Sequence, residues 1–493
     1  MSAEFDKTRP PQCAAPFMGP AEGERMGHAR PGASPCGQAP WGPRPRTISD
    51  GASTERAVAS EGSEGSSGEQ ARISFGLVCL LLFVLVLIAR IPELFPWLAE
   101  LRLGTVTAGI ALLSWLVSPK TIGDKIPVHI KQVQYLLVLF GLSVATIPVA
   151  VWPGGSFEFV VGHYWKQILF FLLVLFWCRS VRDIRWFMWV YCLGMILLVG
   201  NGLLSNVVAS GRFNAESKSV GANELALYLA MVLPFLAYLF SHSGAVGKLV
   251  TVPMFLLCIV GIIFSESRGG FLSLITAGSL IFNRSRMQWS GKVAIIAIAV
   301  LSFALFANQS YWDRIEGLWS PKTDYDGTGG GRTEVWTRGL KVLVTSPWGV
   351  GIDGFAQSEA GHSVTSQVTG NKWLTAHNSF LQVGVELGIA GLIAFVLLLG
   401  RTLWELRQIR LGVCERKSTP GFQGVNGNDL NEPNFSSELV RREVTVLAGA
   451  VEISLWTFVV GGSFLSQAYS AFVYGILALG VAAFALARRG GAG

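Results

Sequence analysis

Long apolar runs recur along most of this chain, and they constrain its fold more than any other feature. The runs hold about 17 to 22 residues each, which is the helix length that crosses a hydrocarbon core of about 30 Å. The composition agrees, because 51% of the 493 residues are hydrophobic and only 14% are charged, whereas soluble domains carry roughly 25% charged residues. The sequence therefore predicts an all-α fold, a polytopic bundle of transmembrane helices.

We expect about twelve spans, with edges uncertain by several residues. They are placed roughly at residues 73–90, 104–118, 132–151, 166–178, 186–203, 223–241, 248–265, 269–283, 292–307, 379–400, 443–460 and 466–487. The first nine spans fill residues 73–307, and the last three fill residues 379–487. Between these groups lies the hydrophilic segment 308–378, which we expect to be partly helical.

Lysine and arginine are distributed unequally between alternate loops. If the N-terminus is cytoplasmic, most of them fall on the inner side, including the basic insert 401–442. The opposite short loops hold only Arg102, Lys166, Arg212, Lys218 and Arg268. Because cytoplasmic loops are enriched in Lys and Arg, we expect both termini in the cytoplasm and segment 308–378 on the outer side.

The two ends of the chain are expected to lie outside the bundle. Residues 1–72 are rich in Pro, Gly, Ser and Ala and show no apolar periodicity, so they cannot bury enough surface to offset the entropy of ordering. We interpret them as a disordered cytoplasmic tail and residues 488–493 as a second, short one. Since no apolar run precedes residue 73, the first span is expected to act as an uncleaved signal.

Several functional classes are disfavoured. The net charge of +7 is spread over many short loops, where it sets membrane orientation, and so it does not indicate nucleic-acid binding. The chain contains no P-loop and no His or Cys spacing typical of a metal site. The three glycines within residues 349–354 are interpreted as a tight irregular turn rather than a phosphate-binding loop, because no Gly-Lys-Ser/Thr follows them. We therefore predict neither a cofactor nor a metal.

Two arginines on the predicted outer side are candidate site residues. Arg268 stands in Ser-Arg-Gly-Gly-Phe-Leu at the membrane boundary, where an arginine is costly and usually paired or functional. The alternative is an arginine that snorkels to the interface beside Glu266. Arg212 stands in Gly-Arg-Phe-Asn, and its alternative is a solvated loop cation.

Segment 308–378 supplies further candidates. Arg332 and Trp336 are four residues apart and would share a helix face, and Arg338 follows. Guanidinium groups match phosphate oxygens better than ammonium groups do. The alternative is an interfacial helix anchored by its tryptophan.

His377 and Asn378 directly precede the tenth span. An imidazole has a reference pKa near 6.5, which suits proton abstraction near neutral pH. The alternative is a histidine at the helix cap or in the membrane interface. Glu386 and Glu452 lie inside apolar runs, and we interpret both as structural hydrogen-bonding groups facing the protein interior.

The order of these motifs resembles one known family. Ser-Arg-Gly-Gly-Phe-Leu, Arg-x3-Trp, Pro-x-Gly-Val-Gly-x3-Phe, His-Asn-Ser-Phe-Leu and Glu-Leu-Gly-x2-Gly follow one another here as in the O-antigen ligase and Wzy-type polymerase superfamily. The resemblance covers roughly residues 73–487. It leaves out the N-terminal tail and residues 413–440. Val-Gly-Ala-Asn before the sixth span departs slightly from the Gly-Asn-Pro-Asn common in that family.

The resemblance implies a GT-C-type glycosyltransferase of the bacterial inner membrane that needs neither a nucleotide sugar nor a metal. Its donor would be a glycan on undecaprenyl diphosphate, and its acceptor a sugar hydroxyl on lipid A-core or on a growing glycan chain. His377 would deprotonate the acceptor, and Arg268 and Arg332 would neutralise the leaving diphosphate, with inversion at the anomeric carbon. Residues expected to bind substrate are Arg212, Arg338, Trp336 and Asn378.

The sequence leaves alternatives open. A ligase and a polymerase differ in the acceptor, which no motif reveals. A solute transporter, such as a bicarbonate carrier, would carry its site near the midplane between discontinuous helices. Here the polar candidates gather at the outer face instead.

Overall fold

The computed structural model describes residues 74–101, 103–118, 127–204, 220–285, 288–290, 293, 297, 332–361, 374–412 and 435–489. These residues belong to one compact unit, and every regular element among them is a helix. The all-α class predicted from the sequence is thereby confirmed.

The first half of the bundle contains α1 to α8. Its elements are α1 (Phe75–Ala89), α2 (Ile91–Leu94), η1 (Pro96–Leu101), α3 (Leu103–Val117), α5 (Lys131–Ala145), η2 (Ile147–Val149), α6 (Pro153–Phe159), η3 (Val160–Tyr164), α7 (Trp165–Trp177) and α8 (Val181–Leu204). The second half contains α9 (Ala222–His242), α10 (Ala245–Phe264), α11 (Arg268–Arg284), α14 (Arg332–Thr345), α16 (Ser379–Arg410), α17 (Phe435–Gly462) and α18 (Ala471–Arg489).

Seven helices in the described part of the chain are long and apolar enough to cross a membrane, which makes this a multi-pass membrane protein. They are Pro153–Trp177, Val181–Gly200, Ala222–His242, Ala245–Phe264, Ser379–Arg410, Glu438–Gly462 and Ala471–Arg488. Three apolar helices are shorter, namely α1, α3 and α5, and their 15 residues each rise about 22 Å. The predicted count of about twelve spans stays a prediction, and the ninth, at 292–307, falls almost wholly outside the described residues.

Two spans differ in extent from the prediction. The fourth was placed at 166–178, but its helix begins at Pro153 and continues through the π-helical turn η3. Glycines and polar side chains near the start of this helix obscured its pattern, although proline at a first helical position is a common start signal. The tenth was placed at 379–400, but α16 runs to Arg410. Its charged end stays helical while Arg401 Nε donates to Glu405 Oε1, four residues on, at 2.7 Å.

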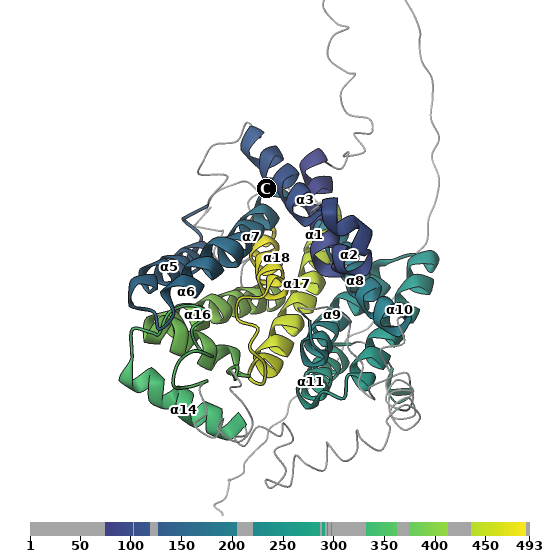
Figure 1. Cartoon of the computed structure of the whole chain (residues 1–493). Helices are drawn as coiled ribbons and strands as arrows, with labels where there is room; N and C mark the ends of the chain where they lie inside the picture. The colour runs from purple at the N-terminus through teal and green to yellow at the C-terminus, as the bar shows by residue number, and fades with distance from the viewer. Residues whose placement is uncertain are drawn as a thin grey trace, which may run out of the picture. The chain divides into compact units, whose positions relative to one another are not determined.

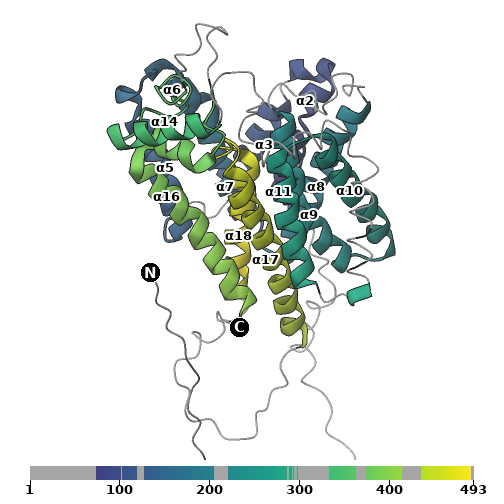
Figure 2. The same cartoon turned by 90° about the horizontal axis from the view of Figure 1, so that it is seen from below.

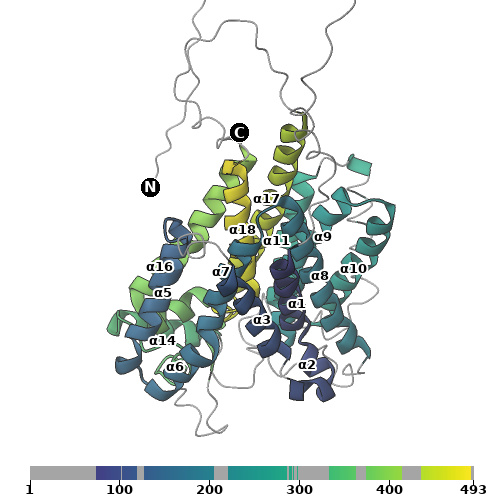
Figure 3. The same ribbon diagram turned by 90° about the horizontal axis from the view of Figure 1, so that it is seen from above.

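The long helices pack side by side, with α17 and α18 near the centre and α9 between α17 and α10 (Figures 1 and 3). α9 contacts α10, α11 and α17, while α16 contacts α5, α17 and α18. α14 packs on α16 and lies across the end of the bundle rather than along it (Figure 2). This end also contains the N-termini of α11 and α16 and the loop at 463–470 that joins α17 to α18, called here the α17–α18 loop.

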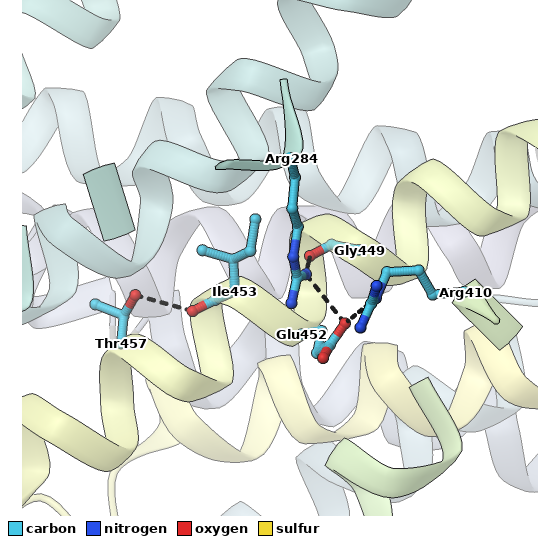
Figure 4. Close-up of polar contacts among 6 residues, drawn as sticks. All are labelled: Arg284, Arg410, Gly449, Glu452, Ile453 and Thr457. Carbon is cyan, nitrogen blue, oxygen red and sulfur yellow. Dashed lines mark hydrogen bonds and ion pairs between the residues drawn. The ribbon is translucent and has the colours of Figure 1, made fainter. Parts of the chain in front are cut away.

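Two carboxylates, one buried and one half-buried, link the helices at the opposite end. Glu452, which is 3% exposed, accepts Arg284 of α11 and Arg410 of α16, both at 3.0 Å (Figure 4). Arg284 Nη1 also donates to the carbonyl of Gly449 at 3.1 Å. Glu443 similarly pairs with Arg185 of α8 and accepts from the Tyr238 hydroxyl of α9. The structural interpretation of Glu452 therefore holds, because its charge is paired inside the protein.

Candidate functional site

His377 lies at the entrance to α16 in an unusual backbone conformation. Its φ is +45°, in the left-handed region that non-glycine residues seldom adopt. The side chain is half-buried, and its Nε2 lies 3.3 Å from the Thr375 hydroxyl. Strained backbone at such a position is typical of functional sites, where the surrounding structure holds it.

The next two residues fix the start of α16. Asn378 is the N-cap, and its Oδ1 accepts the N–H groups of Phe380 and Leu381 at 2.9 and 3.0 Å. The Oδ1 of Asn378 therefore caps the helix. Asn378 was predicted to bind substrate, and only its side-chain NH2 group remains for that contact. The buried Ser379 hydroxyl donates to Leu465 O at 2.6 Å and accepts Gln467 N–H at 2.9 Å. The α16 N-terminus is thus bound to the α17–α18 loop.

Trp336 supports the segment that carries His377. Its indole Nε1 donates to the carbonyl of Ala376, one residue before His377, at 2.9 Å. Its ring lies 6.2 Å from the ring of Phe464 in the α17–α18 loop. The predicted helix at this position is α14, and its inner face packs Val335 and Val342 into a small core with Leu381 of α16. Trp336 therefore holds a backbone position next to the candidate base.

The two arginines of α14 project in different directions. Arg332 is the first residue of the helix, one turn before Trp336 and on the same side. Arg338 follows Trp336 by two residues, which is about 200° around a helix of 3.6 residues per turn. Both side chains are half-buried. Only Arg332 thus shares the Trp336 side of α14.

Arg268 is the first residue of α11 and is half-buried. Ser267 caps this helix, and its Oγ accepts Gly270 N–H at 3.1 Å. A Cβ on Gly270 would collide with Ala226 of α9, so this glycine permits close packing of two helices. A Cβ on Gly269 would lie 3.5 Å from Phe464. Gly269, next to Arg268, and Trp336 therefore both lie close to Phe464.

The α17–α18 loop is the part of the site that sequence reasoning missed. Besides Phe464 and the contacts to Ser379, it binds α9, because Tyr228 donates to Gln467 and lies 2.8 Å from Ser470 Oγ. We had assigned residues 466–470 to the last span, although the polar Ser466, Gln467 and Ser470 interrupt the apolar pattern there. Those polar side chains are the signal that could have identified the loop.

A second connection joins two of the sequence motifs. α16 is broken at Gly388, where φ is +72° and ψ is −174°. The carbonyls of Val385 and Glu386 accept the N–H groups of Val350 and Gly351 at 2.9 and 3.0 Å. The break thus places the Pro-x-Gly-Val-Gly motif directly against Glu-Leu-Gly.

Glu386 lies inside this connection and is 1% exposed. Its Oε1 accepts Phe355 N–H at 3.4 Å, and its carboxylate faces the Tyr469 hydroxyl of the α17–α18 loop. Burial raises the pKa of Tyr469 well above its ordinary value, and the Glu386 charge raises it further. The tyrosine consequently stays protonated and can donate. Glu386 is therefore bonded to the 347–361 segment through Phe355.

The predicted site residues fall into two groups. One end of the bundle holds Arg268 at the start of α11, Arg332, Trp336 and Arg338 on α14, and His377 and Asn378 at the entrance to α16. Arg212 lies outside the described residues. Among the residues that are described, no three His, Cys, Asp or Glu side chains cluster as metal ligands would.

One comparison with known proteins identifies a family. Residues 253–396 match the model of the family described as O-antigen ligase, and this segment runs from α10 to α16. It contains Arg268, Arg332, Trp336, His377 and Asn378 but neither Arg212 nor the α17–α18 loop. No curated protein matches the chain. Over residues 253–396, the chain is therefore similar to the O-antigen ligase family.

Proposed function

We propose that this protein transfers a glycan from undecaprenyl diphosphate to an acceptor sugar hydroxyl at the periplasmic face of the bacterial inner membrane. The single observation that carries the proposal is the position of His377. Its imidazole stands at the α16 entrance, in a backbone conformation held by an N-cap on one side and by Trp336 on the other. The site lies inside the segment that matches O-antigen ligases.

The proposed reaction is a displacement at the anomeric carbon. The acceptor oxygen forms the new glycosidic bond while the bond from the anomeric carbon to the diphosphate oxygen breaks, with inversion. His377 takes the acceptor proton as general base. The diphosphate leaves as an anion and needs no proton. Arg268 and Arg332, with Arg338 and Arg212, stabilise the charge that develops on it.

We propose a ligase, whose acceptor is lipid A-core. The alternative is a Wzy-type polymerase, whose acceptor is another glycan chain, and the family match is compatible with either. Solute transport is the less favoured of the candidate functions. It could use the break in α16, but the carbonyls of Val385 and Glu386 already accept N–H groups of the 347–361 segment. These oxygens are thus occupied rather than directed at a transported ion.

Purified protein tests the proposal directly. We expect glycan transfer from an undecaprenyl-diphosphate glycan to lipid A-core in the presence of EDTA and without any nucleotide. His377→Ala should lower transfer by roughly 10²- to 10⁴-fold. The matched control is His129→Ala, because His129 is exposed next to the start of α5, at the other end of the bundle. A strict requirement for ATP or a divalent metal would overturn the mechanism, as would a His377→Ala enzyme of normal rate.

The acceptor distinguishes the two transferases. Transfer to lipid A-core, without extension of the lipid-linked glycan itself, is the expected result. Extension of the lipid-linked glycan in the absence of lipid A-core would identify a polymerase. Solute flux in proteoliposomes without any glycan transfer would identify a carrier.

A further inference from the structure

The outward face of α14 becomes apolar in its second half. Leu340 and Val344 are four residues apart and are 56% and 79% exposed. Trp348 follows after the helix ends and is 73% exposed. A single exposed apolar side chain is ordinary, whereas neighbouring large ones mark a surface that meets another apolar phase. We call these three residues the α14 strip.

The α14 strip continues onto the exposed side of a candidate membrane span. Ile389 N–H of α16 donates to the carbonyl of Pro347 at 2.8 Å, next to Trp348. From there Ile389, Ile393 and Val396 run along α16 with exposures of 45%, 53% and 47%. α16 is among the helices long and apolar enough to cross a bilayer, so its exposed apolar side is its lipid-facing side. The α14 strip therefore adjoins a surface that lipid already covers.

The first half of the same α14 face is polar. Thr333, Glu334 and Thr337 are exposed there, and the Thr337 hydroxyl donates to the carbonyl of Thr333. In the second half, Lys341 and Thr345 are exposed beside Leu340 and Val344. Polarity on this face thus changes along the helix axis, as expected for a helix with one end in the membrane interface and the other above it. Trp and Lys are the residues that favour this interface.

We propose that the second half of α14, with Trp348, is seated in the outer interface of the lipid bilayer. Arg332, Trp336, Leu340 and Val344 form one row of four-residue steps, and each step turns the row by about 40°. The row begins at the site and ends in the α14 strip. The depth of the strip therefore fixes the depth of Trp336 and of the Ala376 carbonyl to which it donates. The position of α14 in the membrane interface is inferred from the α14 strip alone. An effect of that position on glycan transfer also rests on the proposed function.

Lipid contact can be measured without any activity. Single cysteines replace Val344 or Thr337 in the full chain, with its seven native cysteines removed, and each is labelled with bimane. The protein is then placed in phosphatidylcholine nanodiscs whose acyl chains are brominated near the headgroup. We expect loss of bimane fluorescence at position 344 and not at 337, with aqueous iodide giving the reverse. Equal quenching by brominated lipid at both positions, or none at 344, would overturn the proposal.

Charge substitutions test the consequence for transfer. Val344→Asp places a carboxylate in the interface and should reduce both lipid quenching of a bimane at position 348 and the transfer rate. Val344→Leu and Thr337→Asp should change neither, because the first keeps the side chain apolar and the second alters the polar half. If Val344→Asp lost lipid contact but transferred normally, the link between seating and transfer would be wrong. If lipid quenching at 344 were present while the unsubstituted protein transferred nothing, the proposed function would fail and the seating would stand.

Discussion

At the scale of single residues, the backbone conformation of His377 is held by contacts of its neighbours. A left-handed backbone at a non-glycine residue costs on the order of 1–3 kcal/mol. The surrounding contacts offset this cost, because Asn378 caps α16, Ser379 is bonded to the α17–α18 loop, and Trp336 binds the carbonyl of Ala376. The imidazole is thereby placed before any substrate arrives, as general-base catalysis requires.

Trp336→Phe should separate this positioning from substrate binding. Phenylalanine keeps an aromatic ring beside Phe464 but removes the indole N–H that binds Ala376 O. A neutral hydrogen bond contributes about 0.5–1.5 kcal/mol, so we expect kcat to fall roughly 3- to 10-fold with KM nearly unchanged. Steady-state transfer measures both constants. The control is Trp404→Phe, because Trp404 is an exposed tryptophan near the other end of α16. A rise in KM at constant kcat would instead make Trp336 a substrate ligand.

The transfer rate should depend on the shape of the Arg268 and Arg332 guanidinium groups as well as on their charge. Lysine keeps the charge but cannot bind two phosphate oxygens in a fork. Arg268→Lys and Arg332→Lys should each impair transfer, and the alanine variants should be slower still. Arg442→Lys is the matched control, because Arg442 is exposed and pairs with Glu438 four residues away on α17. If the lysine variants transferred glycan at the rate of the unsubstituted protein, these arginines would not bind the diphosphate through a guanidinium fork.

Local sequence patterns can reveal some of these roles and not others. An Asn directly before an apolar helical run is a typical N-cap signal, so the cap at Asn378 could have been read from the sequence. The bond from Trp336 to Ala376 joins residues 40 positions apart. Such a contact depends on how α14 packs on α16, and no local pattern contains that information. Sequence analysis therefore selected Trp336 as a candidate site residue but did not foresee its contact with Ala376.

At the scale of elements, the break in α16 organises the site end. Gly349 and Gly388 both have positive φ, at +94° and +72°. A Cβ on Gly349 would collide with the carbonyl of Glu386, and one on Gly388 with the carbonyl of Pro347. These glycines let two backbone segments approach closely enough to exchange hydrogen bonds. The tenth span was predicted as one continuous helix, since a lone glycine in an apolar run gives no sign of a break by itself.

Gly388→Ala should destabilise the protein, whereas Gly400→Ala should not. At Gly388 the methyl group meets both positive φ and the carbonyl of Pro347, and alanine at such a position typically costs more than about 1 kcal/mol. Gly400 lies in the regular part of the same helix with nothing within 4 Å of an added Cβ, so alanine there is neutral or stabilising by about 1 kcal/mol. Thermal unfolding of the two purified variants makes the comparison. A Gly388→Ala protein as stable as Gly400→Ala would contradict this account of the break.

At the scale of the whole molecule, the described helices divide the polar groups between two ends. The site residues and the α17–α18 loop lie at one end, and the ion pairs of Glu443 and of Glu452, the latter shown in Figure 4, lie at the other. The Lys and Arg bias predicted this division, because Arg185, Arg284 and Arg410 all fall on the expected cytoplasmic side. It could not predict that these arginines pair with buried carboxylates, since partners on different helices are far apart in the sequence.

The membrane orientation that follows from this division can be tested with reporter fusions. Gly330 stands two residues before α14, which lies at the site end, and Gly424 stands between the end of α16 and the start of α17. Because the arginine-rich end is expected in the cytoplasm, a fusion at Gly330 should give an exported signal and a fusion at Gly424 a cytoplasmic one. The reverse pattern would place the site in the cytoplasm, where a ligase could not meet an acceptor in the periplasm. The same signal at both positions would instead mean that α16 does not cross the membrane.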